Sequence, residues 1–150
     1  MRIKLDISKE RYDEIKFALE KRGIEIDDTT DLVLSESNSF TDNLTVREKG
    51  TNARIILSVE NIVCIESFGH EVEVQTQEAL YLATDRLYRI VSLLDPAKFL
   101  RISNSVVIAR NKVKRISPTL SSKFILTIAN GKSVDVTRSY YYIFKEYFGI

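Results

Sequence analysis

The first part of the chain changes from strand-like to helix-like spacing of hydrophobic positions and back again. Residues 2–7 alternate between apolar and polar side chains, which predicts a strand. Helical spacing follows from Ser8, which can cap a helix, to Gly23, which can end it. Two short strands are then expected at 24–26 and 32–34. The pattern therefore predicts a small β-α-β-β extension at the N-terminus.

A polar, turn-rich stretch, SESNSFTDN at residues 35–43, follows this extension and is typical of a linker. We therefore expect two parts, an N-terminal extension at 1–43 and a main domain at 44–150. An extension this short cannot bury much surface by itself. We expect it to pack on the main domain, on a partner or on its own copy, as an oligomerisation or regulatory unit.

The main domain consists mostly of short apolar or alternating runs separated by turn residues, which predicts strands. The run IVCI at 62–65 is apolar throughout and is expected to be a central strand, after which 66–70 should turn the chain. In the next strand, near 72–75, Gln75 should lie on the exposed side. Asn130-Gly131 predicts a two-residue hairpin turn. Further strands are expected at residues 44–46, 54–59, 79–83, 106–109, 113–116, 124–129 and 133–136.

Two helices complete the main domain. Asp85 can cap the first helix, which Pro96 ends. Its apolar stripe should face the core and consists of Leu87, Ile90, Val91 and Leu94. The second helix covers 139–148, with helical spacing of Tyr140, Ile143, Phe144 and Tyr147. Aromatic side chains can stack on nucleic-acid bases, but this spacing favours a packing face. The fold is thus expected to be mainly β with a few helices (α+β), and the strands between 44 and 83 should form a meander.

Composition limits the class of protein. The hydrophobic share of 44% and the charged share of 29% are ordinary values for a globular protein. No apolar run reaches the 18 or so residues that a membrane-spanning helix needs. Cys64 is the only cysteine, which excludes an internal disulfide and a thiolate metal cluster and favours a buried, inert thiol. We expect a cytoplasmic protein.

Positive charge is concentrated between Phe99 and Arg138. This stretch contains eight Lys or Arg residues and one acid, Asp135, in a chain whose net charge is +1. Its β-branched residues and turn signals place the charge on strands and loops. One-signed charge on a rigid β scaffold suggests a polyanion as partner, and nucleic acid is the first candidate.

Signs of catalysis are absent from the sequence. It contains no glycine-rich phosphate loop, no H-E-x-x-H motif and no nucleophile elbow. His70 is the only histidine, so a Ser-His-Asp site or a histidine metal site would depend on this residue alone. We therefore expect no enzyme, no cofactor and no small-molecule substrate.

From Phe99 onward the order of features resembles the LytTR family of DNA-binding domains, which occur in bacterial transcription regulators. Members have a Phe-x-Arg segment, a short polar stretch, two strands, a hairpin with Gly and a Ser/Thr-Arg-x-Tyr close. The matching residues are Phe99, Arg101, Ser103-Asn104-Ser105, Val106 to Ala109, Ile116, Gly131 and Thr137-Arg138-Ser139-Tyr140. With the upstream IVCIESFGHEVEV, the strand at 79–83 and the helix before Pro96, the resemblance covers about residues 44–150.

The resemblance implies an elongated, multi-sheet β fold that bends double-stranded DNA and reads the major groove through loops, not through a recognition helix. The matching loop positions are His70, Asn104 and Arg138. Arg can hold guanine O6 and N7 together, and Asn can do the same with adenine N6 and N7. Other roles are open for all three: Arg138 could pair with Asp135, Asn104 could serve only the turn, and His70 could be an ordinary exposed turn residue.

Phosphate contacts, which position a protein without specifying a sequence, are expected from the other polar residues of the basic stretch. The candidates are Arg101, Ser103, Arg110, Lys112, Lys114, Arg115 and Lys132. The resemblance further implies binding to paired direct repeats as a homodimer on DNA. It also implies a membrane protein as a candidate regulator, because short members without a receiver domain are often restrained by one.

An alternative function is a protein-interaction module that keeps this fold and binds DNA only weakly or without specificity. Two departures from the family pattern motivate it. Ser103-Asn104-Ser105-Val106 stands where members often have His-Arg-Ser-Tyr, and Ala109 stands where they often have Asn. The sequence thus predicts a DNA-binding regulator first and an interaction module of the same fold second.

Overall fold

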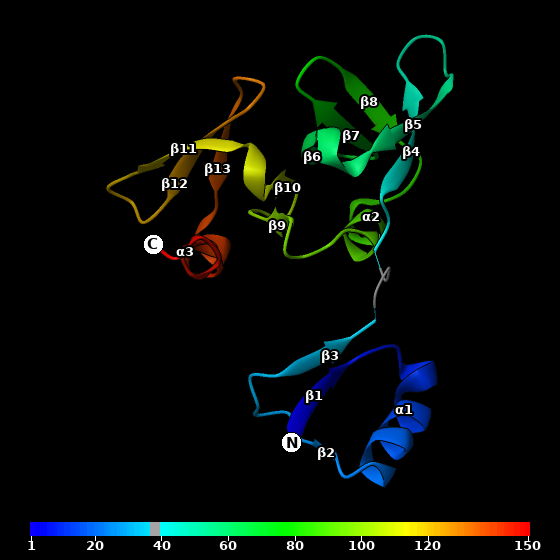
Figure 1. Ribbon diagram of the computed structural model, residues 1–150. Coiled ribbons are helices and arrows are strands. Elements are labelled where there is room, and N and C mark those ends of the chain that lie inside the picture. The colour runs from blue at the N-terminus through cyan, green and yellow to red at the C-terminus, as the bar shows by residue number, and fades with distance from the viewer. Residues whose placement is uncertain (37–39) are drawn as a thin grey trace. The chain divides into compact units, whose positions relative to one another are not determined.

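A computed structural model describes residues 1–36 and 40–150 of the chain. The chain separates into two compact units, Met1–Ser39 and Phe40–Ile150 (Figure 1). The predicted linker, residues 35–43, includes 37–39, which lie outside the described residues. Phe40 to Asp42 belong to the second unit, in which the Thr41 amide donates a hydrogen bond to the Leu93 carbonyl.

The first unit is a three-stranded parallel sheet with one helix. Its strand order is β2-β1-β3, so that β1 is the central strand. The elements are β1 (Arg2–Asp6), α1 (Lys9–Lys21), β2 (Glu25–Ile26) and β3 (Val33–Ser35). Ile3 and Leu5 are the buried residues of this sheet, and α1 contains none. A core of this size is small, as the short sequence predicts.

Ser8 occupies the N-cap position of α1, but its hydroxyl makes no capping bond to the helix. Its amide and its hydroxyl both donate to Glu36 Oε1, at 2.9 and 3.0 Å. These two hydrogen bonds lower the pKa of the Glu36 carboxyl. Ser8 therefore connects the start of α1 to the residue that follows β3.

The second unit is built on a seven-stranded sheet with the order β5-β4-β8-β7-β6-β10-β9. Its strands are β4 (Asn43–Glu48), β5 (Arg54–Ser58), β6 (Ile62–Phe68), β7 (Glu71–Thr76), β8 (Leu80–Ala83), β9 (Phe99–Arg101) and β10 (Val106–Ala109). The expected meander is correct only for β6, β7 and β8. The hairpin of β4 and β5 joins the sheet through β4 and β8, so β5 is an edge strand and not the neighbour of β6.

Residues 62–65 of β6 and all of β10 are buried on both faces, which explains why these two runs are apolar throughout. On one face, Ile62, Ile65 and Val107 pack with α2 (Leu87–Leu93), whose apolar stripe points to this core as expected. On the other face, Val63 and Ile108 pack against a second sheet. The seven-stranded sheet is therefore the middle layer of this unit.

The second sheet has the order β11-β12-β13, formed by Val113–Pro118, Phe124–Ile128 and Ser133–Val136. It is followed by the 3-10 helix η3 (Arg138–Tyr140) and by α3 (Tyr141–Phe148), which lies against the sheet (Figure 1). Phe144 of α3 is fully buried and contacts the Phe124 ring at 5.3 Å between centroids. The aromatic residues of α3 thus mainly form a packing face, although Ile143, expected in the stripe, is exposed.

Three expectations about the seven-stranded sheet and α2 are wrong. The turn at 66–70 is shorter than expected, because β6 continues to Phe68 and only Gly69 and His70 connect it to β7. Gln75 is buried, and its side-chain carbonyl accepts hydrogen bonds from Asn130 in the β12–β13 turn and from Cys64. Asp85 does not cap α2: Arg86 holds the N-cap position, and Asp85 accepts a hydrogen bond from its amide.

Cys64 is buried between the two sheets, as expected for an inert thiol. Its sulfur donates to Gln75 Oε1 at 3.2 Å. Burial raises the pKa of the Cys64 thiol to about 11. The thiol is therefore protonated at neutral pH and does not act as a nucleophile.

Packing of α3 on the second sheet should make Phe144 a large contributor to stability. We expect Phe144→Ala to lower the free energy of unfolding by about 3–5 kcal/mol, because it leaves a cavity among fully buried side chains. Tyr142→Ala on the same helix is the matched control and should change it by less than about 0.5 kcal/mol, because Tyr142 is exposed. Urea denaturation monitored by circular dichroism measures both, and equal losses would contradict this packing.

Candidate nucleic-acid interface

Three connecting segments meet at one end of the second unit. The β6–β7 turn contains His70, and the loop between β9 and β10 contains Asn104. These two lie side by side because β10 pairs with the end of β6, where the Ser67 amide donates to the Ser105 carbonyl at 2.8 Å. The third segment, after β13, is joined to the second where the Thr137 amide donates to the Ile102 carbonyl at 3.0 Å.

An open pocket of about 370 Å³ lies at this end, which we call the loop end. His70 and Asn104 are among its lining residues and are both exposed. Asn104 Oδ1 accepts a hydrogen bond from the Tyr140 hydroxyl at 3.3 Å, which orients the amide group. Two of the three predicted base-contacting side chains therefore share one pocket.

Arg138, the third predicted base contact, is the first residue of η3. It is exposed, and it makes no ion pair among the residues that the structure describes. The alternative of a surface pair with Asp135 is therefore not seen there. Its neighbours Thr137 and Tyr140 both bond to the β9–β10 loop, which holds Arg138 near Asn104.

Arg101 and Ser103 have structural roles within the β9–β10 loop. The Arg101 guanidinium donates to the Asn104 carbonyl at 3.2 Å, and its Nε is buried with no hydrogen-bond partner in the described part of the chain. Ser103 is buried, and its hydroxyl accepts a hydrogen bond from the Ser105 amide at 3.2 Å. A buried hydroxyl is unsuited to the surface phosphate contact expected of Ser103.

Arg86 and Tyr88 line the same pocket and were missed in the sequence. For Arg86, the sequence signal that could have been used is the presence of an arginine at the start of α2. An N-cap usually carries Ser, Thr, Asp or Asn, and a cation there is opposed by the helix dipole. Arginine at this position therefore points to a use other than helix stability.

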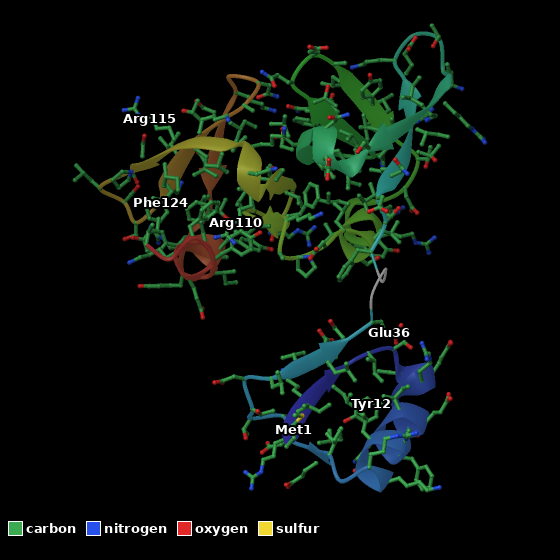
Figure 2. The ribbon with its side chains drawn as sticks, in the orientation of Figure 1. Met1, Tyr12, Glu36, Arg110, Arg115 and Phe124 are labelled. Carbon is green, nitrogen blue, oxygen red and sulfur yellow. The ribbon has the colours of Figure 1, made fainter. Side chains whose placement is uncertain are left out.

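The remaining basic residues do not share one face, contrary to the expectation of a single basic surface. Arg110 and Lys112 form the 3-10 helix η2 (Arg110–Lys112), at the end of β10 opposite to the loop end. Lys114 and Arg115 are exposed on β11, and Figure 2 shows Arg115 on the side of that strand facing away from α3. Tertiary structure thus divides the basic stretch into separate groups.

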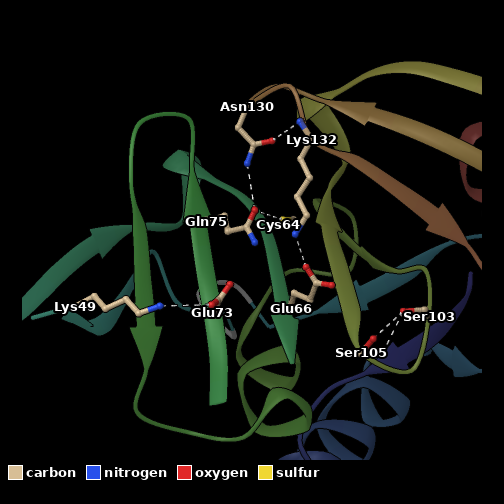
Figure 3. A network of polar contacts seen from close by, with 9 residues as sticks. All are labelled: Lys49, Cys64, Glu66, Glu73, Gln75, Ser103, Ser105, Asn130 and Lys132. Atoms are coloured by element: carbon tan, nitrogen blue, oxygen red, sulfur yellow. Dashed lines mark hydrogen bonds and ion pairs between the residues drawn. The ribbon is translucent and has the colours of Figure 1, made fainter. Parts of the chain in front are cut away.

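Lys132 belongs to a polar junction between the two sheets, formed by Glu66, Gln75, Asn130 and Lys132 (Figure 3). The Lys132 ammonium is paired with Glu66 on β6. Asn130, in the β12–β13 turn, donates from Nδ2 to Gln75 Oε1 at 3.2 Å. The hairpin turn at Asn130-Gly131 is longer than the two residues predicted, because the Ile128 amide donates to the Lys132 carbonyl and residues 129–131 form the loop. This turn contributes to docking of the second sheet, and Lys132 is occupied within the protein.

Over residues 1–36 and 40–150, no group of three His, Cys, Asp or Glu side chains is arranged to hold a metal ion. In the same residues, no helix is both long enough and apolar enough to cross a membrane.

Loss of the Glu66–Lys132 pair should weaken the junction. We expect Lys132→Met to lower the free energy of unfolding by on the order of 1 kcal/mol, because it leaves a half-buried carboxylate without its partner. Lys114→Met, on an exposed position of β11, removes the same charge and should have an effect below about 0.5 kcal/mol. Urea titrations of both variants test this, and equal effects would refute the junction's contribution.

Comparison with known proteins agrees with this architecture. A family model described as LytTr DNA-binding domain matches residues 52–149. The sensory transduction protein LytT of Bacillus subtilis (strain 168) is 26% identical over 110 residues, which cover 73% of this chain and 46% of LytT. The transcriptional regulatory protein LytR of Staphylococcus aureus (strain MW2) is 27% identical over 95 residues, which cover 63% of this chain and 39% of LytR.

A solved LytTr DNA-binding domain from Bacillus cereus has the same fold, with a TM-score of 0.68 and 24% sequence identity. The match covers 73% of this chain and 99% of that domain. This chain spans less than half the length of the curated relatives that it matches. The match to the family model extends over most of the second unit. The chain therefore belongs to the LytTR family of DNA-binding domains.

Proposed function

We propose that this protein is a transcription regulator that binds double-stranded DNA in a sequence-specific manner and contacts the major groove through its loops. The observation that carries the proposal is the gathering of three loop segments at one end of a LytTR-family domain. Each segment presents an exposed side chain able to bond a base edge or a phosphate: His70, Asn104 or Arg138. Because the proposed partner is bacterial DNA, a cytoplasmic location is part of the proposal.

Base readout is assigned first to Arg138 and Asn104. The Arg138 guanidinium, free of ion pairs among the described residues, can donate two parallel hydrogen bonds to guanine. The Asn104 amide keeps its Nδ2 donor and one Oδ1 lone pair after bonding Tyr140, which is the pattern that adenine requires. His70 adds a donor or acceptor from the neighbouring turn.

Affinity is assigned mainly to phosphate contacts. Arg86 at the loop end and Lys114 and Arg115 on β11 are exposed cations suited to this role. Binding should therefore weaken as salt increases, because cations that neutralise phosphates release counterions. Ser103 and Lys132 are left out, since both are engaged within the protein.

The first unit is proposed to join two copies of the chain into a dimer, both free in solution and on paired DNA sites. Its strand β3 lies at the edge of the sheet, and Leu32, Val33 and Leu34 are 52%, 49% and 40% exposed. An apolar edge strand of this kind invites pairing with another strand. A membrane-protein regulator is the second proposed protein partner of the chain.

Substitution of Arg138 tests the proposed readout. We expect Arg138→Ala to weaken binding to the specific site by about 1–3 kcal/mol and to relax sequence preference. Arg138→Lys keeps the charge but not the paired hydrogen bonds, so it should retain non-specific binding and lose discrimination. Fluorescence anisotropy with the DNA upstream of this protein's own coding region, beside a scrambled duplex, measures both.

Unchanged specific binding by Arg138→Ala would refute this assignment of readout. Equal, salt-sensitive binding of the wild type to both duplexes, together with tight binding to a protein partner, would instead support the interaction module.

Substitution on β3 tests the proposed dimer contact. We expect Val33→Asp to convert the full chain from dimer to monomer, because an edge charge opposes strand pairing. Ile56→Asp is the matched control, since Ile56 is an exposed apolar residue on the edge strand β5 of the second unit and should leave the dimer intact. Sedimentation velocity distinguishes the two, and a monomeric wild type would overturn the proposal.

A further inference from the structure

A second open pocket, of about 510 Å³, lies at the end of the seven-stranded sheet opposite to the loop end. Its sides are η1 (Val59–Asn61), η2 and the segment 97–99 that precedes and begins β9. These elements meet because β9, β10 and β6 pair in antiparallel fashion, so that the start of β9 lies beside the end of β10 and the start of β6. We call this hollow the η pocket.

Positive charge dominates the η pocket. Lys98, Arg110 and Lys112 line it, against a single acid, Glu60. None of the three cations makes an ion pair within residues 1–36 and 40–150. Three cations against one carboxylate around a concave surface leave an excess of positive charge, which raises the local potential and favours an anion.

The Arg110 guanidinium is held in place by stacking, and among the described residues its N–H donors make no hydrogen bond. It stacks on the Tyr147 ring at 4.9 Å and lies 5.7 Å from the Phe148 ring centre. Figure 2 shows this side chain beside α3. Stacking occupies a face of the planar group and leaves the N–H donors at its edge. No described residue accepts a hydrogen bond from them, so they are available to a ligand.

Backbone and side-chain hydrogen bonds connect the rim of the pocket. The Arg110 amide donates to the Lys98 carbonyl at 2.8 Å, which makes these two cationic residues neighbours. The Ala129 amide donates to the Lys112 carbonyl at 2.8 Å, which ties η2 to the second sheet. The Tyr147 hydroxyl donates to the Ala97 carbonyl at 2.8 Å. The cations are therefore presented by segments that need little rearrangement to bind.

The rest of the lining is both apolar and amide-bearing. Val59, Phe99 and Ala109 are buried residues that contribute an apolar part of the wall. Asn61 and Asn111 contribute side-chain amides and are exposed. A pocket of several hundred Å³ with apolar walls and a few polar groups has the size and composition of small-ligand sites.

We propose that the η pocket binds a small organic phosphate, whose phosphoryl oxygens bond Arg110 and pair with Lys98 and Lys112. Arginine suits phosphate because its fork of donors matches two oxygens, and the two lysines act as point charges. The organic part of the ligand lies against Val59 and Phe99. This site is separate from the loop end and does not rest on the proposed DNA readout.

Titration of the full chain with inorganic pyrophosphate and with ADP, followed by isothermal calorimetry in the absence of DNA, tests the site. We expect saturable binding, with ADP binding more tightly because it adds contacts to the apolar wall. Lys98→Met and Lys112→Met should each weaken binding roughly tenfold, since each removes one charge-assisted contact. Lys123→Met, which removes an exposed cation from the β11–β12 loop, is the matched control and should bind like the wild type.

Two results would overturn the proposal: no saturable binding by the wild type, or equal affinity in Lys98→Met, Lys112→Met and Lys123→Met. A third result would also overturn it, because it would identify another source of the phosphate. If duplex DNA displaces ADP from the wild type and from Arg138→Ala alike, the η pocket holds a DNA backbone phosphate and not a small ligand. Thermal unfolding of each variant separates loss of the site from loss of fold. Because the titrations with pyrophosphate and ADP contain no DNA, failure of the proposed readout would leave their results interpretable.

Discussion

Docking of the second sheet on the seven-stranded sheet depends on the polar junction at Gln75 and Asn130. Gln75 is buried, and its carbonyl oxygen accepts hydrogen bonds from both Asn130 and Cys64. If the two sheets docked differently, the buried Gln75 amide would lose these hydrogen bonds without gaining hydrogen bonds to water, and this loss would cost free energy. The arrangement in which the two sheets meet at this point is therefore favoured over others that the apolar surfaces alone would permit.

The geometry at both ends of the second unit depends on how the second sheet docks on the seven-stranded sheet. Arg138 follows β13 of the second sheet, whereas His70 follows β6 of the seven-stranded sheet, so their relative positions depend on how the sheets dock. At the other end, α3 packs on the second sheet and positions Arg110 through its aromatic residues. The loop end and the η pocket are thus supported by one core.

Charge is distributed in a way that matches two different uses. The loop end presents exposed Arg and Asn side chains on short segments, where they can reach into a groove. The η pocket instead gathers cations around a concave surface, where they would surround a ligand. The strands β9 and β10 run between the two ends, and β10 is fully buried, so the two sites are connected by a rigid part of the fold.

Local pattern in the sequence determined most of the elements. Alternating and helical spacing predicted the strands and helices, and uniformly apolar runs predicted the doubly buried strands, because these signals come from neighbours along the chain. The order of motifs was enough to point to His70, Asn104 and Arg138. What the sequence could not determine is which side chains face each other across the sheets.

Tertiary structure alone decided that Gln75 is buried, that Lys132 pairs with Glu66 and that Ser103 is inside its loop. It also separated Arg110 and Lys112 from the loop end and placed them beside Lys98, although all the basic residues had looked alike. The physical reason is that pairing between distant strands sets these contacts, and a run of charge along the chain contains no information about that pairing.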